Sequence, residues 1–116
     1  MQPIITDTAT GIMYRKWETA SPEAVFLLVH GLGAQSTRWK FLADFLNKNN
    51  ISAYAIELRG YGETKETKAH IDSFNIYYED IISLSQIIQQ ELPGKKIFIA
   101  GESMGALLAF LVCIKN

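Results

Sequence analysis

The chain has 116 residues, of which 48% are hydrophobic and 20% charged, with 11 basic and 12 acidic side chains and a formal net charge of −1. This composition is typical of one soluble globular domain, and it excludes a disordered chain and one that binds nucleic acid or an anionic membrane surface through its charge. The first residues lack the basic and apolar regions of a signal peptide, and no apolar run reaches the about 18 residues that span a bilayer. The single cysteine, Cys113, cannot form an internal disulfide. We therefore expect a cytoplasmic protein without a transmembrane segment.

Two short strands are predicted at the start of the chain. Ile4–Thr6 and Ile12–Trp17 are rich in β-branched and aromatic residues, and the turn-prone segment Asp7–Gly11 separates them. We therefore expect a short N-terminal β-hairpin, which ends before Ser21-Pro22-Glu23.

Three later apolar runs are typical of strands buried on both faces of a parallel sheet: Ala24–Val29, Ile51–Leu58 and Ile97–Ala100. Helix-like segments separate them and follow the last one. The order strand, helix, strand, helix, strand, helix predicts an α/β fold in which a mostly parallel sheet has flanking helices on both faces. No internal repeat divides the chain, so we expect residues 1–116 to belong to a single domain.

The first helix is predicted after the strand Ala24–Val29, and Ser36 or Thr37 can cap its start. The turn-prone residues Asn47–Asn50 end it. Its apolar stripe comprises Trp39, Leu42, Ala43, Phe45 and Leu46.

A second long helix is predicted over about Asn75–Leu92, and Pro93-Gly94 stops it. Its apolar face comprises Ile81, Leu84, Ile87 and Ile88. The segment between strand and helix, Arg59–Asp72, is rich in glycine and charge and predicts a loop.

The last predicted strand leads into a Gly-x-Ser-x-Gly motif, Gly101-Glu102-Ser103-Met104-Gly105, and an Ala/Leu-rich run follows. A sharp strand-to-helix turn holds a serine in a strained conformation where a base and an electrophile can both reach its hydroxyl. Gly101 and Gly105 leave room for the strand and the helix to approach each other, and the helix N-terminus favours an oxyanion. The motif therefore predicts that Ser103 is a nucleophile.

A second motif, His30-Gly31-Leu32-Gly33, follows the strand Ala24–Val29. Both motifs fall at the carboxyl ends of parallel strands, where open α/β sheets bind ligands, so we expect them to face one crevice. A dinucleotide-binding domain is the alternative fold, but it requires a third glycine in Gly-x-Gly-x-x-Gly, and Ser36 occupies that position.

These two motifs, with Glu57-Leu58-Arg59-Gly60-Tyr61-Gly62-Glu63-Thr64 between them, resemble the α/β-hydrolase superfamily, nearest to its monoacylglycerol lipase and lysophospholipase-like members. The resemblance extends from the N-terminal hairpin to Asn116. It implies the N-terminal portion of an α/β-hydrolase fold and a hydrolase that acts on a small-molecule acyl ester, with no cofactor and no metal. Serine at the turn, rather than the aspartate of related dehalogenases and epoxide hydrolases, indicates acyl transfer.

The resemblance also implies roles for single residues. Ser103 is expected to be the nucleophile, and the backbone N–H groups of Leu32 and Met104 are expected to form the oxyanion hole. His30 is expected to order the oxyanion loop rather than to act as the base. Supporting roles follow for Gly31, Gly33, Gly101 and Gly105.

The chain departs from the family pattern Asp-x-Arg-Gly-x-Gly-x-Ser, because Glu57 stands for the aspartate and Thr64 for the serine. We expect Glu57 and Arg59 to form a structural hydrogen-bonded pair at the strand end. We expect Glu102 to interact favourably with the helix N-terminus without a catalytic role. Further residues have simple structural interpretations: a solvated His70, a buried Cys113 thiol, and packing roles for Trp39, Tyr77 and Tyr78.

Family members carry an acid and a histidine after the nucleophile, yet none of the 13 residues that follow Ser103 is acidic or a histidine. We therefore expect the N-terminal half of a larger enzyme, without its later strands and cap, and with little activity of its own. The strand Ile97–Ala100 is then expected to be an exposed edge that drives self-association. Two other functions stay open: a non-catalytic binding module, and another acyl-transfer enzyme such as a thioesterase, an acyltransferase or a peptidase.

Overall fold

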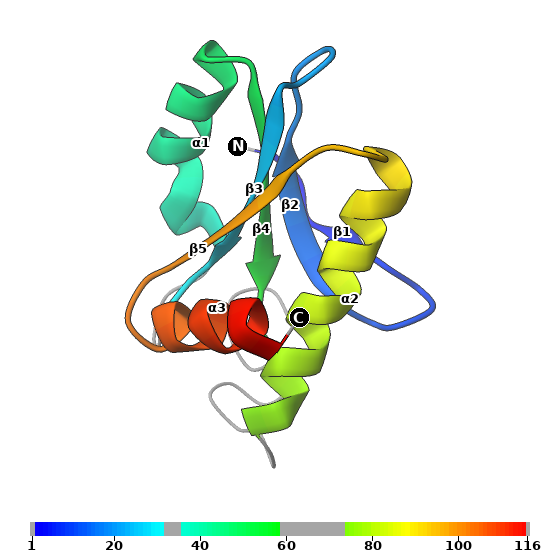
Figure 1. The fold of residues 1–116 in the computed structure, drawn as a ribbon, viewed down its shortest axis with the longest axis vertical. Coiled ribbons are helices and arrows are strands. Elements are labelled where there is room, and N and C mark those ends of the chain that lie inside the picture. Colours follow the sequence, from blue (N-terminus) through cyan, green and yellow to red (C-terminus); the bar gives the residue numbers. More distant parts are fainter. Residues whose placement is uncertain (1, 32–35, 59–73, 116) are drawn as a thin grey trace.

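The computed structural model describes residues 2–31, 36–58 and 74–115 of the chain, which form one sheet with helices on both faces (Figure 1). The strands are β1 (Ile5–Thr6), β2 (Met13–Trp17), β3 (Ala24–Val29), β4 (Ile51–Glu57) and β5 (Ile97–Gly101). The helices are the 3₁₀-helix η1 (Ser36–Trp39) and the α-helices α1 (Lys40–Lys48), α2 (Phe74–Glu91) and α3 (Met104–Lys115). The predicted fold class is confirmed.

The sheet has the order β1-β2-β4-β3-β5, with β3 parallel to both of its neighbours, β4 and β5. Leu27 of β3 lies opposite Tyr54 on one side and Ile99 on the other. The predicted hairpin is present as an antiparallel pair, in which Ile5 lies opposite Tyr14, and β2 continues antiparallel onto β4. The carboxyl ends of β3, β4 and β5 therefore lie at the same end of the sheet, where both sequence motifs begin.

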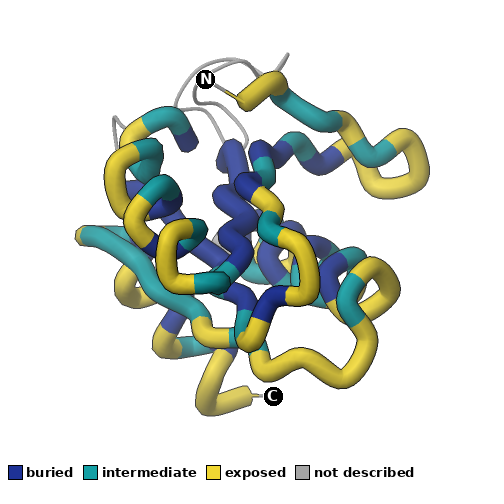
Figure 2. Tube along the Cα trace, turned by 90° about the horizontal axis from the view of Figure 1, so that it is seen from above, coloured by how far each residue is buried: buried dark blue, intermediate teal, exposed yellow. Residues whose placement is uncertain are grey.

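Each face of the sheet has its own apolar core, and Figure 2 shows the buried residues gathered in the middle of the molecule. Alternate residues along β3 and β4 face opposite sides, as the pleat of a strand requires. The larger core lies under α2 and α3 and includes Val25, Leu27, Val29, Tyr54, Ile56, Tyr77, Ile81, Leu84, Ile88 and Leu108. The smaller core lies under α1 and comprises Trp17, Leu28, Ala43, Leu46, Ala53 and Ala55.

The packing of α1 differs from the predicted stripe. Ala43 and Leu46 are buried, whereas Phe45 is 61% exposed and Leu42 37% exposed. The α1 side of the sheet presents the small side chains of Ala53 and Ala55, so a narrow strip of the helix is enough to cover it. The predicted stripe was therefore too wide.

The predicted cap of the first helix is also wrong. The helix α1 begins only at Lys40, and no side chain donates or accepts a capping hydrogen bond at Trp39. The turn η1 precedes it, and the Ser36 hydroxyl accepts a hydrogen bond from Nε of Arg15 instead (3.1 Å). The hydroxyl of Ser36, which was expected to cap α1, thus binds a side chain of β2.

The aromatic residues pack as expected: Tyr77 is buried in the larger core, Tyr78 packs against that core, and Trp39 packs against the smaller one. Tyr54 also ties α2 to the sheet, because its hydroxyl donates to the carboxylate of Glu91, which accepts a second hydrogen bond from Lys16 (3.1 Å). Burial, reinforced by Glu91, raises the pKa of Tyr54, so this hydroxyl stays a donor.

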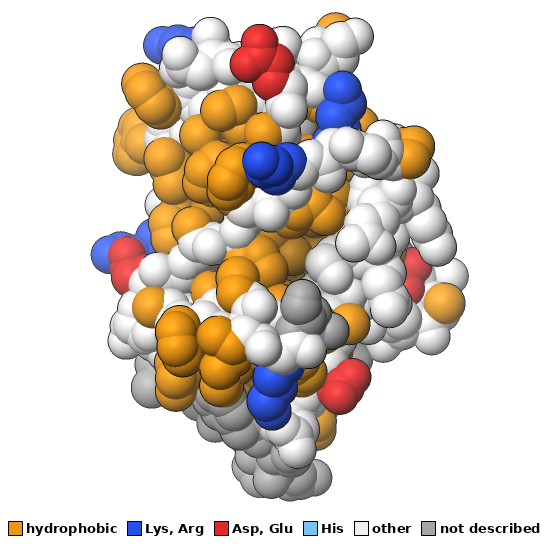
Figure 3. Space-filling view, in the orientation of Figure 1, with side chains coloured by type: hydrophobic (Ala, Val, Ile, Leu, Met, Phe, Trp, Pro, Cys, Tyr) orange, Lys and Arg blue, Asp and Glu red, His pale blue; other side chains and the backbone are white. Residues whose placement is uncertain are grey.

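The helix α3 buries one side only. Gly105, Leu108, Ala109 and Val112 are buried on that side. The expectation of a buried Cys113 is wrong: its thiol is exposed, because position 113 lines an open hollow between α3, α2 and β5. Figure 3 shows hydrophobic side chains gathered on this face of the molecule, over α1, β5 and α3. The exposed large ones on β5 and α3 are Phe98, Leu107, Phe110 and Ile114.

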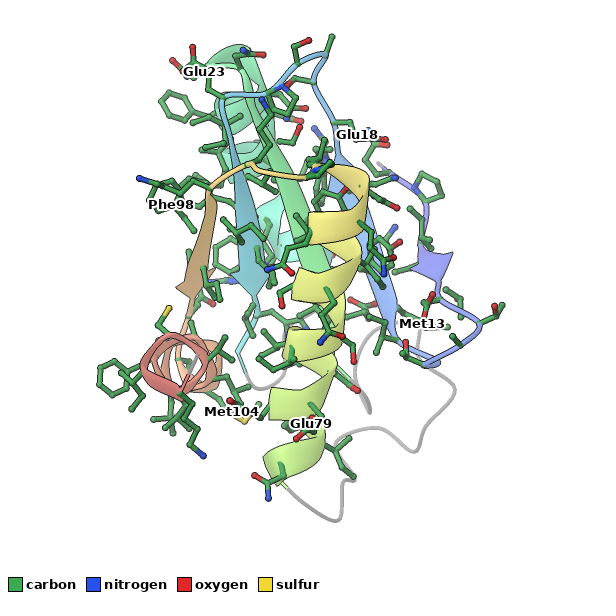
Figure 4. The ribbon with its side chains drawn as sticks, turned by 45° about the vertical axis from the view of Figure 1, so that its right-hand side comes forward. Met13, Glu18, Glu23, Glu79, Phe98 and Met104 are labelled. Carbon is green, nitrogen blue, oxygen red and sulfur yellow. The ribbon has the colours of Figure 1, made fainter. Side chains whose placement is uncertain are left out.

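The strand β5 forms one edge of the sheet, as expected, and the labelled Phe98 lies at this margin in Figure 4. Since an apolar edge strand can pair with another chain, we predict concentration-dependent self-association through β5. The variant Phe98→Lys should reduce it, because a lysine on an edge opposes strand pairing. Sedimentation velocity over a range of concentrations measures the effect.

The matched control is Thr8→Lys, which adds the same charge in the exposed turn of the hairpin. A wild-type chain that sediments as a protease-resistant monomer at every concentration would contradict this prediction.

Candidate active site

The Gly-x-Ser-x-Gly motif forms a tight turn between β5 and α3. The strand ends at Gly101, the helix begins at Met104, and Ser103 between them is exposed with a φ of 59°. This left-handed conformation is unfavourable for a residue with a Cβ and is maintained by the surrounding structure. The Glu102 N–H donates to Val29 O (3.2 Å), and the Gly105 N–H donates to Glu102 O (2.9 Å).

Two glycines allow this turn to close. A Cβ built on Gly101 would lie 2.1 Å from the carbonyl oxygen of Gly105, and one built on Gly105 would lie 2.2 Å from that of Val29. Both contacts are with backbone atoms, which cannot rotate away as a flexible side chain can. The helix α3 therefore lies against the ends of β3 and β5 with no room for a side chain at either glycine.

The second motif meets the first at Gly31. A Cβ built on this buried glycine would lie 2.8 Å from Cβ and 3.5 Å from Oγ of Ser103. The backbone that follows β3 thus packs directly against the candidate nucleophile. This contact was predicted, because both motifs follow the carboxyl ends of parallel strands. Leu32 and Gly33, the other expected parts of this motif, lie outside the described residues.

Met104, the other expected oxyanion donor, is the first residue of α3 (Figure 4). The first N–H groups of a helix lack intrahelical acceptors and point out of its N-terminus, where the helix dipole favours negative charge. The side chain of Met104 is partly buried and packs against the larger core. Its backbone N–H and the side chain of Ser103 therefore sit at the same end of α3.

His30 is completely buried, and both of its ring nitrogens bind backbone. The N–H of Leu58 donates to Nε2 (3.0 Å), so Nδ1 carries the proton and donates to the carbonyl oxygen of Gly31 (2.9 Å). Burial lowers the pKa of His30, an effect that the Gly31 carbonyl and the Glu57 carboxylate only partly oppose. His30 is a neutral residue that links the ends of β3 and β4.

The expected partner of Glu57, Arg59, lies outside the described residues. Within the described residues, the carboxylate of Glu57 accepts a hydrogen bond from the N–H of Ser36 (2.6 Å). Sequence reasoning missed Arg15, which is 5% exposed and reaches the hydroxyl of the same serine. The only signal for it was a basic residue within a strand that is otherwise suited to burial.

Glu102 forms an ion pair with Arg38 of η1, with 2.7 Å between Nε and Oε1. The pair joins the turn at Ser103 to η1. Because both side chains are about half exposed, its contribution to stability is small, about 0–1 kcal/mol. Glu102 thus lies at the N-terminus of α3, as expected, and also has a charged partner in η1.

The described segments 2–31, 36–58 and 74–115 contain neither a cluster of metal-ligating side chains nor a membrane-spanning helix. No group of three or more His, Cys, Asp or Glu side chains there could hold a metal ion. None of the helices in these segments is long and apolar enough to cross a bilayer. His70, which was expected to be solvated, and Thr64, which stands for the serine of the family pattern, lie outside these segments.

We predict that Gly105→Ala destabilises the fold by about 2–4 kcal/mol, because the new methyl group meets backbone of β3. Urea unfolding measures the loss. The control is Gly94→Ala, where φ is 79° but no atom lies within 4 Å of the new Cβ. This control should lose only about 1–2 kcal/mol, from backbone strain alone. Equal losses in the two variants would rule out the proposed close contact.

The neutral state of His30 predicts a pH dependence. The unfolded chain protonates this histidine near its ordinary pKa of 6.5, whereas the folded state does so only at lower pH. Its contribution to the free energy of unfolding is therefore complete above pH 6.5 and is lost as the pH falls, by at most about 1.4 kcal/mol per pH unit. Urea unfolding of wild type and His30→Asn at several pH values tests this, and parallel pH profiles would contradict it.

The sequence matches the family model described as serine aminopeptidase, S33, over residues 20–116. It is similar to the monoglyceride lipase of Homo sapiens, with 29% identity over 103 residues, which cover 88% of this chain and 34% of that protein. The monoglyceride lipase homolog of monkeypox virus is 30% identical over 95 residues, which cover 82% of this chain and 34% of that protein.

Among solved structures, the monoacylglycerol lipase of Paleococcus ferrophilus is similar, with a TM-score of 0.72 and 30% sequence identity. The similarity covers 90% of this chain and 38% of that one. The chain spans about a third of the length of the curated relatives it matches.

Proposed function

The chain belongs to the α/β-hydrolase family described as serine aminopeptidase, S33, and from this membership we propose that Ser103 is the nucleophile of a serine hydrolase that cleaves carboxylic esters through an acyl-enzyme. One observation carries the proposal: Ser103 has a φ of 59°, and the backbone of Gly31 packs against its side chain. This is the arrangement that serine catalysis needs, with an exposed hydroxyl beside backbone that can stabilise an oxyanion.

The proposed reaction begins when Oγ of Ser103 attacks the carbonyl carbon of the ester and loses its proton to a base. The carbonyl oxygen becomes an oxyanion, which accepts hydrogen bonds from the backbone N–H groups assigned to Met104 and Leu32. The bond to the alcohol then breaks, and the alcohol leaves with a proton. Water hydrolyses the acyl-enzyme in the same way, which releases the carboxylic acid and restores Ser103.

His30 does not serve as the base in this proposal. Its Nε2 accepts a hydrogen bond from Leu58 and its Nδ1 proton is donated to Gly31, so neither nitrogen is directed at Ser103. We propose that the base and its acidic partner come from residues outside this segment, that residues 1–116 form the N-terminal part of one hydrolase domain, and that these residues alone have little activity. We also place the enzyme in the cytoplasm, where Cys113 stays a free thiol.

Two substrate classes are favoured by particular similarities. The relatives named monoglyceride lipase favour an acylglycerol ester, which is our first choice together with the lysophospholipid-like ester suggested by the resemblance of the motifs. The family description, serine aminopeptidase, favours a peptide with a free amino terminus as the second. The same nucleophile serves both, so a substrate panel separates them.

The test uses the natural protein that contains these residues, with a panel of monoacylglycerols, lysophospholipids and aminoacyl anilides. We expect ester hydrolysis and labelling by a fluorophosphonate, and Ser103→Ala should lower the hydrolysis rate by about 10⁴-fold or more and abolish labelling. The 116-residue chain by itself should label slowly.

Ser85→Ala is the matched control, because the hydroxyl of Ser85 donates to the carbonyl oxygen of Ile82 within α2. Hydrolysis that survives in Ser103→Ala would overturn the assignment of the nucleophile. Rapid labelling of Ser103 in the 116-residue chain would overturn the proposal that its base lies elsewhere.

A further inference from the structure

The end of β4 holds two points of the backbone, Ser36 and Gly31, of which Gly31 lies against the candidate nucleophile. Glu57, the last residue of β4, is 2% exposed, and its carboxylate accepts the N–H of Ser36 at 2.6 Å. A hydrogen bond between a backbone N–H and a buried carboxylate is short and about twice as strong as a neutral one. Ser36 is therefore fixed relative to the sheet.

The next residue, Leu58, holds the other point. Its N–H donates to Nε2 of His30, and the Nδ1–H of the same imidazole donates to the carbonyl oxygen of Gly31. Two consecutive residues at the end of β4 thus fix Gly31 and Ser36, the described residues on either side of positions 32–35. Gly31 is also the residue whose backbone packs against the side chain of Ser103.

A third strand contributes as well. Arg15 of β2 lies opposite Ala55 of β4, is 5% exposed, and its Nε donates to the hydroxyl of Ser36 at 3.1 Å. Burying charged side chains is costly, and apolar residues of similar volume often stabilise a protein as well or better. A contribution to stability is thus a weak explanation for Arg15 and Glu57, whereas fixing a backbone position needs directional partners of this kind.

We propose that Glu57 is a positioning residue of the active site: together with Arg15 it fixes Ser36 against the end of β4, where Leu58 and His30 hold Gly31 at the correct distance from Ser103. In its kinetic part the inference rests on the proposed function, since it takes Ser103 as the nucleophile. Glu57 touches no reacting atom in this scheme. Its effect reaches Ser103 through Leu58, His30 and Gly31, so it should change the rate of acylation more than the binding of the substrate.

The first measurement is amide hydrogen exchange at Ser36 and Leu58 in the 116-residue chain, which needs no catalysis. Glu57→Gln, which keeps an acceptor oxygen but loses the charge, should raise exchange at Ser36 by about tenfold. Glu57→Asp should stay near wild type, as should the matched control Glu79→Gln on the exposed surface of α2 (Figure 4). Unchanged exchange at Ser36 in Glu57→Gln would overturn the inference whether or not Ser103 reacts.

The second measurement is ester hydrolysis by the natural protein that contains these residues. Glu57→Gln should lower kcat by about 10-fold to 100-fold, as small displacements near a reacting centre do, with KM changed by less than about threefold. Glu57→Asp should recover most of kcat. An unchanged kcat in a folded Glu57→Gln variant would overturn the inference.

Failure of the proposed function has a different signature. The wild-type natural protein would then neither hydrolyse esters nor label at Ser103, and hydrogen exchange at Ser36 would decide the positioning role of Glu57 independently.

Discussion

The arrangement around Ser103 depends on how closely the backbone of α3 approaches the ends of β3 and β5. That distance is set by two positions without a side chain, Gly101 and Gly105, each of which faces backbone atoms at a separation that no Cβ would tolerate. With α3 so close, the chain must turn within two residues, and the left-handed conformation of Ser103 is the consequence. The strain at the serine and the tight packing of the helix are thus one feature, maintained by the core beneath α3.

A second constraint is that polar groups buried beside this turn need partners. His30, Ser36, Glu57 and Arg15 all lie at or near the carboxyl ends of the strands, are almost fully buried, and form hydrogen bonds to one another or to backbone. Buried polar groups without partners are costly, so such a set is either complete or strongly destabilising. Completeness here fixes Gly31 and Ser36 relative to the ends of β3 and β4, whereas an apolar cluster would lack directional partners.

Much of the fold could be predicted from the sequence, since strand and helix periodicity indicated the element order. The two glycine-containing motifs predicted a candidate site, and the described parts of both motifs, Gly31 and Ser103, lie in contact. The predictions failed where tertiary packing decides. Periodicity could not tell that Phe45 of α1 and Cys113 of α3 are exposed, because that depends on the size of the side chains opposite the helix and on which elements cover it. Nor could it show that Arg15, 21 positions before Ser36, reaches that hydroxyl, since this contact exists only once β2 has joined β4.

The strand order also determines when the site can form. Leu27 of β3 pairs with Ile99 of β5, 72 positions later in the sequence, while β4 occupies the other side of β3. Contacts between such distant segments form slowly, because a long stretch of chain must be ordered first. The left-handed turn at Ser103 can close only after β5 has joined the sheet, so the close approach of Gly31 to Ser103 exists only in a molecule whose sheet is already assembled.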